Sequence, residues 1–185
     1  MYPVPYFGQE DPTTPKDPKM KEQNSDTRKI DYEYSRRSGP PHRRGKSWFF
    51  GIGIDTYRAF PALNNAVKDV KDLLAVLQEH YRLPGLQVLT LFNEQATRDG
   101  IINTLYRLVD EVQPEDSLLL YYSGHGHLHQ KTEKGFWIPW DAARESPSKF
   151  IANSMIRDFM QDIDSLHTLL ISDACFSGSL FVPGK

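Results

Sequence analysis

Residues 117–126 read SLLLYYSGHG, and this stretch decides how the chain can fold. The uninterrupted apolar and aromatic run 118–122 is typical of a strand buried on both faces, as in a parallel sheet covered by helices. Small residues and one histidine, His125, follow the run at once. Because ligand sites in open α/β sheets lie just beyond the carboxyl ends of the strands, we expect this strand to end at a functional site.

The same pattern of strand followed by helix continues on both sides of this stretch. Such alternation predicts right-handed crossovers and an α/β fold with a mostly parallel sheet. We expect further strands at 48–54, 86–92 and 168–172, a short strand or hairpin arm at 135–140, and helices at 64–81, 97–112 and 154–163.

The first 46 residues differ in composition from the rest of the chain. They hold 7 of the 13 prolines and 10 Lys or Arg against 7 Asp or Glu, and their few apolar residues follow no helical or strand period. Such a segment cannot offset its ordering entropy with a core of its own. We therefore interpret residues 1–46 as a Pro-rich basic arm or pro-region and residues 47–185 as the folded domain. The basic stretch 36–44 lacks interleaved aromatic side chains, which favours a solvated linker over a nucleic-acid partner.

Several classes of protein are excluded by the sequence. Its longest apolar run is far shorter than the roughly 20 residues that a bilayer-spanning helix requires, so no membrane partner is expected. The N-terminus lacks the basic-then-apolar pattern of a secretory signal, which predicts a cytoplasmic protein. The single cysteine, Cys175, excludes an intrachain disulfide and a multi-thiolate zinc site.

Cys175 and His125 occupy equivalent places in this pattern. Cys175 lies in the segment DACFSG (173–178), directly after the last expected strand, as His125 lies directly after the strand 117–123. The carboxyl ends of parallel strands meet at one edge of a sheet, so we expect the two side chains to converge. A thiolate nucleophile needs a nearby imidazole, which His125 can supply before it protonates a leaving amine. The alternatives are a buried structural thiol and a capping or surface histidine.

Two further patterns indicate other chemistries. Gly51 and Gly53 lack the third glycine of a dinucleotide fingerprint, so close packing in a buried strand is the favoured interpretation. His125, His127 and His129 alternate on an extended segment, which would place three imidazoles on one face, as in the zinc site of a metal-binding hydrolase. The acid of the familiar His-x-His-x-Asp-His motif is missing, so we expect His127 and His129 at the rim or facing solvent.

The segments YYSGHG (121–126) and DACFSG (173–178) resemble the catalytic histidine and cysteine motifs of the caspase-like cysteine peptidases. This clan contains the caspases, the metacaspases and the bacterial orthocaspases. Residues 53–57 (GIDTY) and 63–69 (LNNAVKD) also look like metacaspase segments, and the resemblance covers about residues 47–180.

The resemblance implies a caspase-like three-layer fold, with helices on both faces of the sheet. It also implies an endopeptidase with His125 and Cys175 as catalytic dyad and an acyl-thioester intermediate. The backbone N–H groups of Gly126 and Cys175 are implied to form the oxyanion hole. No third catalytic acid is evident. A non-catalytic caspase-like signalling scaffold is the rival interpretation, which the intact His125 and Cys175 disfavour.

The acid two residues before the cysteine points to the metacaspase or orthocaspase branch. The resemblance implies that Asp69, Asp173 and Ser123 belong to the S1 pocket, and two carboxylates suit a guanidinium or an ammonium group. The implied cleavage is therefore after Arg or Lys. The alternative is that Asp69 caps or bridges structure and that Asp173 only fixes the cysteine loop.

The remaining expectations concern cofactors, partners and regulation. Many metacaspases bind calcium through an acidic run, but residues 150–156 contain no carboxylate, so neither calcium dependence nor another cofactor is expected. A caspase-like domain continues past the cysteine loop, so we expect a separate C-terminal small-subunit chain to complete the sheet. Lys185 is expected to be a self-cleavage or activation site, with a truncated chain as the alternative. The resemblance also suggests a role in bacterial cell death or antiviral signalling, with which such peptidases are associated.

Overall fold

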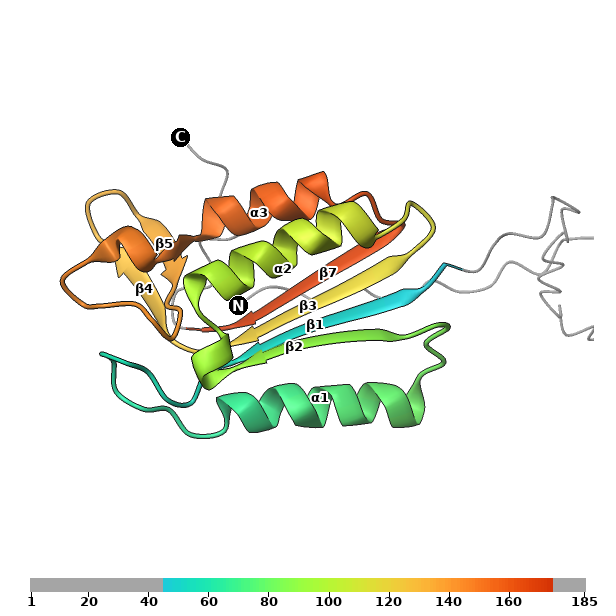
Figure 1. Cartoon of the computed structure of the whole chain (residues 1–185), viewed down its shortest axis with the longest axis horizontal. Helices are drawn as coiled ribbons and strands as arrows, with labels where there is room; N and C mark the ends of the chain where they lie inside the picture. The colour runs from blue at the N-terminus through green and yellow to red at the C-terminus, as the bar shows by residue number, and fades with distance from the viewer. Residues whose placement is uncertain (1–44, 175–185) are drawn as a thin grey trace, which may run out of the picture. The chain divides into compact units, whose positions relative to one another are not determined.

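Four parallel strands form the central sheet in the computed structural model, which describes residues 45–174. They are β1 (Ser47–Gly53), β2 (Gln87–Phe92), β3 (Ser117–Ser123) and β7 (His167–Asp173), in the order β2-β1-β3-β7 (Figure 1). The parallel sheet expected from the sequence is confirmed. Most of the proposed arm, together with Cys175 and Lys185, lies outside the described residues.

Helices cover both faces of this sheet (Figure 1). Helix α1 (Ala66–His80) lies on one face, and α2 (Arg98–Glu111) and α3 (Asn153–Asp162) lie on the other. The three layers agree with the expected α/β architecture. Among residues 45–174, no helix combines the length and apolarity that crossing a bilayer requires.

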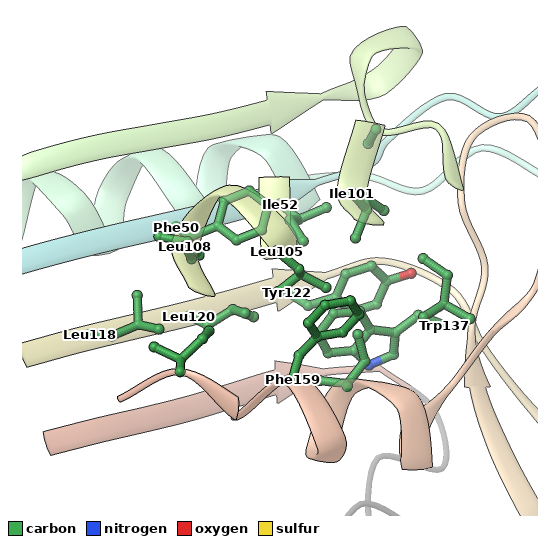
Figure 2. Packing of buried hydrophobic residues seen from close by; sticks show 14 of the residues in the cluster. Phe50, Ile52, Ile101, Leu105, Leu108, Leu118, Leu120, Tyr122, Trp137 and Phe159 are labelled. Atoms are coloured by element: carbon green, nitrogen blue, oxygen red, sulfur yellow. The ribbon is translucent and has the colours of Figure 1, made fainter. Parts of the chain in front are cut away.

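The alternation of side chains along β3 divides the core in two. Leu118, Leu120 and Tyr122 point into the larger core, under α2 and α3 (Figure 2). Tyr121 points to the opposite face, where it packs with Phe49 and Val70 beneath α1. The apolar run 118–122 is therefore buried on both faces, as its composition predicts.

Two glycines of β1 let α1 approach the sheet closely. A Cβ atom at Gly51 would lie 2.4 Å from Val70 Cγ1, and one at Gly53 would lie 2.8 Å from the carbonyl oxygen of Ala66. Any larger residue would push the first turns of α1 away from the strand. The packing interpretation of these glycines is confirmed, and its consequence is that the first turn of α1 lies directly over the carboxyl end of β1.

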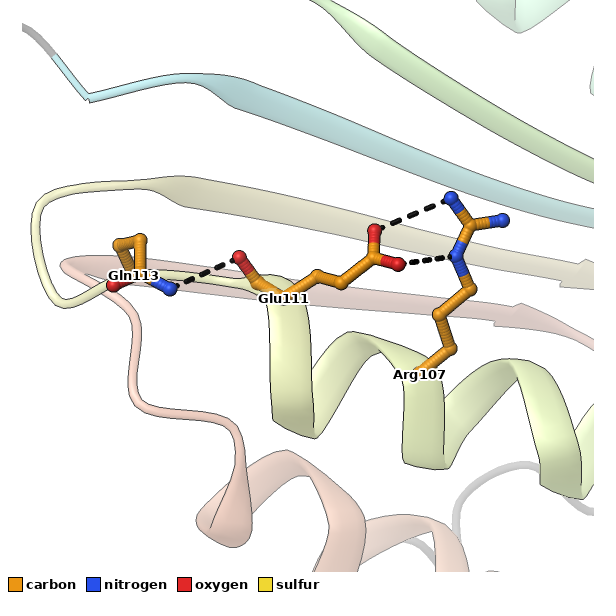
Figure 3. A network of polar contacts seen from close by, with 3 residues as sticks. All are labelled: Arg107, Glu111 and Gln113. Atoms are coloured by element: carbon orange, nitrogen blue, oxygen red, sulfur yellow. Dashed lines mark hydrogen bonds and ion pairs between the residues drawn. The ribbon is translucent and has the colours of Figure 1, made fainter.

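Helix α2 has a side-chain cap at its start and an ion pair near its end. The Thr97 hydroxyl accepts a hydrogen bond from the Gly100 N–H at 3.0 Å. Arg107 pairs with Glu111 one turn later, and the Gln113 side-chain amide donates to the carbonyl of Glu111 (Figure 3). Because Arg107 and Glu111 are exposed, solvent screens their pair and it contributes little to the stability of the helix.

A second, smaller antiparallel sheet begins directly after His125. It consists of β4 (Gly126–His129), β5 (Lys134–Trp137) and β6 (Ile151–Ala152), in the order β4-β5-β6. The sequence predicted a short strand or hairpin arm at 135–140 but not its partner β4. The single-turn helices η1 (Asn93–Gln95) and η2 (Pro147–Lys149) complete the described elements.

Asp116 joins two segments at the amino end of the sheet, opposite His125. Its carboxylate accepts hydrogen bonds from the backbone N–H of Lys46 at 2.6 Å, the Trp48 indole N–H at 2.9 Å and the backbone N–H of Gln113 at 3.1 Å. The residue is only 2% exposed. Burial by itself would raise the pKa of Asp116, but the three hydrogen bonds outweigh it and lower the pKa.

Candidate active site

His125 lies at the carboxyl edge of the sheet, two residues after the end of β3. Its ring atom Nε2 lies 2.9 Å from the carbonyl oxygen of Pro61, in the loop between β1 and α1. A carbonyl oxygen only accepts hydrogen bonds, so Nε2 carries the proton in this contact. In the neutral imidazole this leaves the lone pair of Nδ1 free to take a proton from another group. A backbone carbonyl therefore orients the histidine where a catalytic triad would use an acid.

Two tyrosine hydroxyls hold the backbone of His125. The N–H of His125 donates to Tyr57 Oη at 2.7 Å, and Tyr122 Oη donates to the carbonyl of His125 at 2.7 Å. The two hydroxyls also bond to each other. Gly124 is required between them, because a Cβ atom there would lie 2.7 Å from both oxygens.

Tyr57 also packs against the ring that its hydroxyl helps to position. The centroids of the Tyr57 and His125 rings are 4.8 Å apart. Burial, followed by smaller effects of its hydrogen bonds and of Asp55, raises the pKa of Tyr57 to about 12. The hydroxyl therefore stays neutral over the pH range in which a histidine titrates.

The strand that leads to Cys175 is aligned with the strand that leads to His125. Ser123 and Asp173 are register partners at the ends of β3 and β7, and the N–H of Gly124 donates to the carbonyl of Asp173. His125 and Cys175 each follow this pair by two residues. Cys175 itself lies outside the described residues, so the alignment concerns the strand ends.

Trp137 links the two strands from the side of the small sheet. Its indole N–H donates to the Ser172 hydroxyl on β7 at 3.0 Å. Its ring stacks on Tyr122 of β3, with centroids 4.3 Å apart and planes 3° from parallel. One buried side chain therefore contacts both strands next to the motifs that they carry.

The three residues assigned to the S1 pocket all lie near Tyr121. Ser123 and Asp173 are register partners, so their side chains point to the same face of the sheet, which is also the face of Tyr121 and of α1. Asp69 lies in the first turn of α1. Burial raises the pKa of Tyr121, and the charges of Asp173 and Asp69 raise it further, while a hydrogen bond with Ser123 acts in the opposite direction. Tyr121 is therefore near all three.

The structure gives no support to the alternative of a metal site at His125, His127 and His129. His127 is exposed and its ring lies beside Phe150 and Phe136, while Nδ1 of His129 lies 3.0 Å from the Thr132 hydroxyl. In the part of the chain that the structure describes, no group of three His, Cys, Asp or Glu residues is arranged to hold a metal ion. His127 and His129 are both exposed, as expected for residues that face solvent, and the metal-binding alternative is not favoured.

Sequence reasoning missed several residues that shape the site. Pro61 contributes a backbone carbonyl, which leaves no trace in a side-chain pattern. Tyr57 stands in the segment 53–57 that resembles metacaspases. Its contact with His125 joins residues 68 positions apart, which a local pattern does not reveal. Tyr121 and Trp137 were assigned only to strands. Their aromatic character and position beside the motif were the available signals.

The chain has a mostly parallel sheet between two helical layers. A histidine and the strand that leads to the single cysteine lie at the carboxyl edge of this sheet. This arrangement defines the class of caspase-like cysteine peptidases. Comparison of the chain with known proteins supports this class. A family model described as "Metacaspase, peptidase C14 domain" matches residues 49–182. The chain belongs to the metacaspase family.

Individual relatives support the same family. Metacaspase-2 of Trypanosoma brucei brucei is 32% identical over 149 residues, which cover 70% of this chain and 41% of that protein. Metacaspase-1 of Eremothecium gossypii is 27% identical over 170 residues, which cover 82% of this chain and 35% of that protein. The chain thus spans about two fifths of the length of these curated relatives.

A solved structure supports the fold. A crystal structure of a Geobacter sulfurreducens protein matches with a TM-score of 0.57 at 20% sequence identity, covering 70% of this chain and 50% of that one. At this level of identity the likeness concerns the fold alone.

Proposed function

We propose that this chain carries the catalytic dyad of a cysteine endopeptidase that cleaves after Arg or Lys. The observation that carries the proposal is the pairing of Ser123 with Asp173. It places the ends of two strands side by side, with His125 two residues beyond one end and Cys175 two residues beyond the other. Membership of the metacaspase family supports the same assignment.

The chemistry follows from the orientation of His125. Because Nε2–H is held by the Pro61 carbonyl, Nδ1 is the atom that takes the proton of the Cys175 thiol. The thiolate attacks the scissile carbonyl, and the N–H groups of Gly126 and Cys175 stabilise the oxyanion by a few kcal/mol. The imidazolium then protonates the leaving amine, which leaves an acyl-thioester. Water, deprotonated by His125, hydrolyses the thioester and releases the acid.

A basic P1 side chain matches the charges on the α1 face of the site. Asp69 is half-buried and Asp173 is exposed, and the charges of both raise the pKa of Tyr121. A guanidinium or ammonium group placed between these carboxylates forms charge-assisted hydrogen bonds with them, and the Ser123 hydroxyl adds a neutral partner. An aspartate at P1 would meet like charges there and is expected to be rejected.

The exposed edge of the sheet supports a small-subunit partner. Among the described residues, β7 is an edge strand, and two of its apolar side chains, Leu169 and Ile171, are 56% and 37% exposed. An apolar edge strand of this kind calls for a covering partner. We propose that a C-terminal small subunit of the same protein pairs with β7. Lys185 is a residue that an acidic S1 site accepts, so activation by self-cleavage after Lys185 belongs to the same proposal.

Peptide hydrolysis by the purified full-length protein tests the function. Fluorogenic peptides ending in Arg or Lys should be hydrolysed and peptides ending in Asp should not, with no loss of activity in a chelator. His125→Ala and Cys175→Ala should abolish hydrolysis. His80→Ala, at the exposed end of α1, is the matched control and should leave it unchanged. Activity that survives Cys175→Ala, or that prefers Asp, would refute the assignment.

Self-cleavage has a separate test. Mass spectrometry of the full-length protein should show cleavage after Lys185 in the wild type and none in isolated Cys175→Ala protein. Cleavage of that variant in isolation would mean that another protease performs the step.

A further inference from the structure

The free edge of β4 begins at the residue after His125. In the small sheet β4 pairs with β5 on one side, and among the described residues no strand pairs with its other side. Gly126 opens this strand and is also the residue whose N–H is assigned to the oxyanion hole. The edge of β4 is therefore continuous with the reaction centre.

The pairing of β4 with β5 determines which backbone groups point outward. The N–H of Ile138 donates to the carbonyl of His125, so these two residues form a hydrogen-bonded pair. In an antiparallel ladder, hydrogen-bonded pairs alternate with pairs that make no such bonds. Gly126 and Trp137 therefore form a pair without these hydrogen bonds, and so do Leu128 and Gly135. The N–H and C=O groups of Gly126 and Leu128 point away from β5, toward the open edge.

An open groove of about 400 Å³ lies beside β4 and the turn that follows it. It is lined by the consecutive residues 127–131, which continue the chain from Gly126. An unpaired strand edge with outward-pointing main-chain groups suits an extended peptide, because added strands bind through those groups. Leu128 is one of the lining residues and is half-buried.

We propose that the β4 edge binds the part of the substrate that follows the scissile bond, as an added parallel strand. This inference rests on the proposed peptidase function. The carboxylates for the P1 side chain lie on the α1 face, whereas the small sheet packs its Trp137 and Ile151 into the core beneath α3. A substrate peptide whose P1 side chain is held on the α1 face crosses toward the opposite face after the scissile bond. Its residues after that bond then run along β4.

Parallel pairing assigns each hydrogen bond of this strand. The N–H of Gly126 donates to the P1 carbonyl, which is the oxyanion contact, and the C=O of Gly126 accepts the N–H of P2′, the second residue after the scissile bond. The N–H of Leu128 then donates to the P2′ carbonyl, and the C=O of Leu128 accepts the N–H of P4′. The N–H of P3′ points away from β4 and makes no bond to it.

Backbone methylation of the substrate tests this alternation. Quenched fluorescent peptides spanning P4 to P4′ would be compared with copies N-methylated at P2′, P3′ or P4′. Methylation at P2′ or P4′ should lower kcat/KM about fivefold, because each removes one hydrogen bond, and methylation at P3′ should leave it unchanged. The P3′ peptide is the matched control for the conformational effect of the methyl group. Equal effects at all three positions would overturn the proposal.

A second arm uses the protein backbone. Leu128→Pro removes the outward N–H at a position whose N–H is not needed by the β4–β5 ladder, and edge strands tolerate proline. It should lower kcat/KM for the P4–P4′ peptide about fivefold relative to Leu128→Ala. Both variants should cleave an aminocoumarin substrate, which has no residues after the scissile bond, at the same rate. Should Leu128→Pro lose both activities through misfolding, the methylation series with the wild-type protein decides.

The two substrates separate this inference from the proposed function. If the Arg-aminocoumarin substrate is cleaved, but the extended peptide is cleaved no faster and the position of methylation has no effect, the β4 proposal is overturned. The peptidase function then still stands. Failure to cleave either substrate overturns both.

Discussion

The hydroxyl oxygen of Tyr57 lies 2.7 Å from the backbone nitrogen of His125, so a side chain from the loop after β1 accepts the main-chain N–H of the residue whose imidazole we assign to catalysis. The same loop supplies the Pro61 carbonyl to the other end of His125, its ring Nε2. One segment therefore positions both the backbone and the ring of His125. The loop in turn is held by Asn93, whose side-chain carbonyl accepts the N–H groups of Asp55 and Thr56.

Tyr57→Phe should impair catalysis more than substrate binding. The variant keeps the ring contact with His125 but leaves the N–H of His125 without its acceptor. We expect kcat to fall about tenfold, as about 1–1.5 kcal/mol of positioning is lost, with KM changed less than twofold. Steady-state kinetics with an Arg substrate measures the split.

Two controls distinguish positioning from general destabilisation. Tyr106→Phe, at a tyrosine that is 59% exposed on α2, should leave both constants unchanged. Circular dichroism should show Tyr57→Phe folded like the wild type under the assay conditions, so that unfolded protein does not account for the lower kcat. An unchanged kcat in Tyr57→Phe would contradict the positioning role.

Asp69→Asn and Asp173→Asn should each weaken hydrolysis of Arg and Lys substrates. Each change removes one of the two charges that we assign to the P1 cation, at a cost of about 1.5–3 kcal/mol, or roughly tenfold to a hundredfold in kcat/KM. Asp72→Asn, on the exposed side of α1, is the control and should have no effect. Wild-type kcat/KM in both single variants would disprove the S1 assignment.

The pKa of Tyr121 provides a readout of the same carboxylates without substrate. Burial and the charges of Asp173 and Asp69 raise this pKa above the usual value. Removing both charges with the double variant Asp69→Asn/Asp173→Asn should lower it, while the effect of burial stays. Tyrosine titration followed by NMR measures the change, and an identical pKa in wild type and double variant would place the carboxylates away from Tyr121.

Asp116→Ala should strongly destabilise the fold. It leaves the buried Trp48 indole N–H and two backbone N–H groups without their acceptor, so we expect the free energy of unfolding to fall by about 3 kcal/mol. Urea unfolding followed by circular dichroism measures it. Glu115→Gln, next in the chain and exposed, is the control and should change the free energy by less than about 0.5 kcal/mol.

The contribution of Asp116 should depend on pH in a defined direction. The pKa of Asp116 is lower in the folded protein than its ordinary value of 3.8. Its ionised form therefore stabilises the fold fully above that value, and the contribution is lost as the pH falls through the lower, folded pKa. The difference in unfolding free energy between wild type and Asp116→Asn should shrink below about pH 4. A difference that is constant from pH 7 to pH 2 would contradict this account.

Ser172→Ala should destabilise the link between β7 and the small sheet. It leaves the buried Trp137 indole N–H without a partner, at a cost of about 1–3 kcal/mol. Trp137→Phe removes the donor instead. In a double-mutant cycle the two changes should be less than additive by about 1 kcal/mol in unfolding free energy. Strict additivity would show that the hydrogen bond contributes nothing.

The strands and helices were predictable because their signals are local. The run 118–122 is apolar on both faces whatever surrounds it, and the Thr97 cap acts within one turn of α2. Strand β4 was not predicted, because His127 and His129 interrupt the apolar pattern and its pairing with β5 depends on residues later in the chain. The metal-site alternative is not favoured for a related reason. The rings of His127 and His129 have separate neighbours, which alternation alone does not specify.

By itself, the sequence determined the α/β class and the two motifs that carry His125 and Cys175, with Asp173 two residues before the cysteine. These properties follow from residue type and local period, which do not depend on distant parts of the chain. Only the tertiary structure decided that Pro61 and Tyr57 hold His125, that Tyr121 lies near both carboxylates, and that β4 presents a free edge next to Gly126. These contacts join residues far apart in sequence, and packing of the sheet and helices brings them within hydrogen-bonding distance.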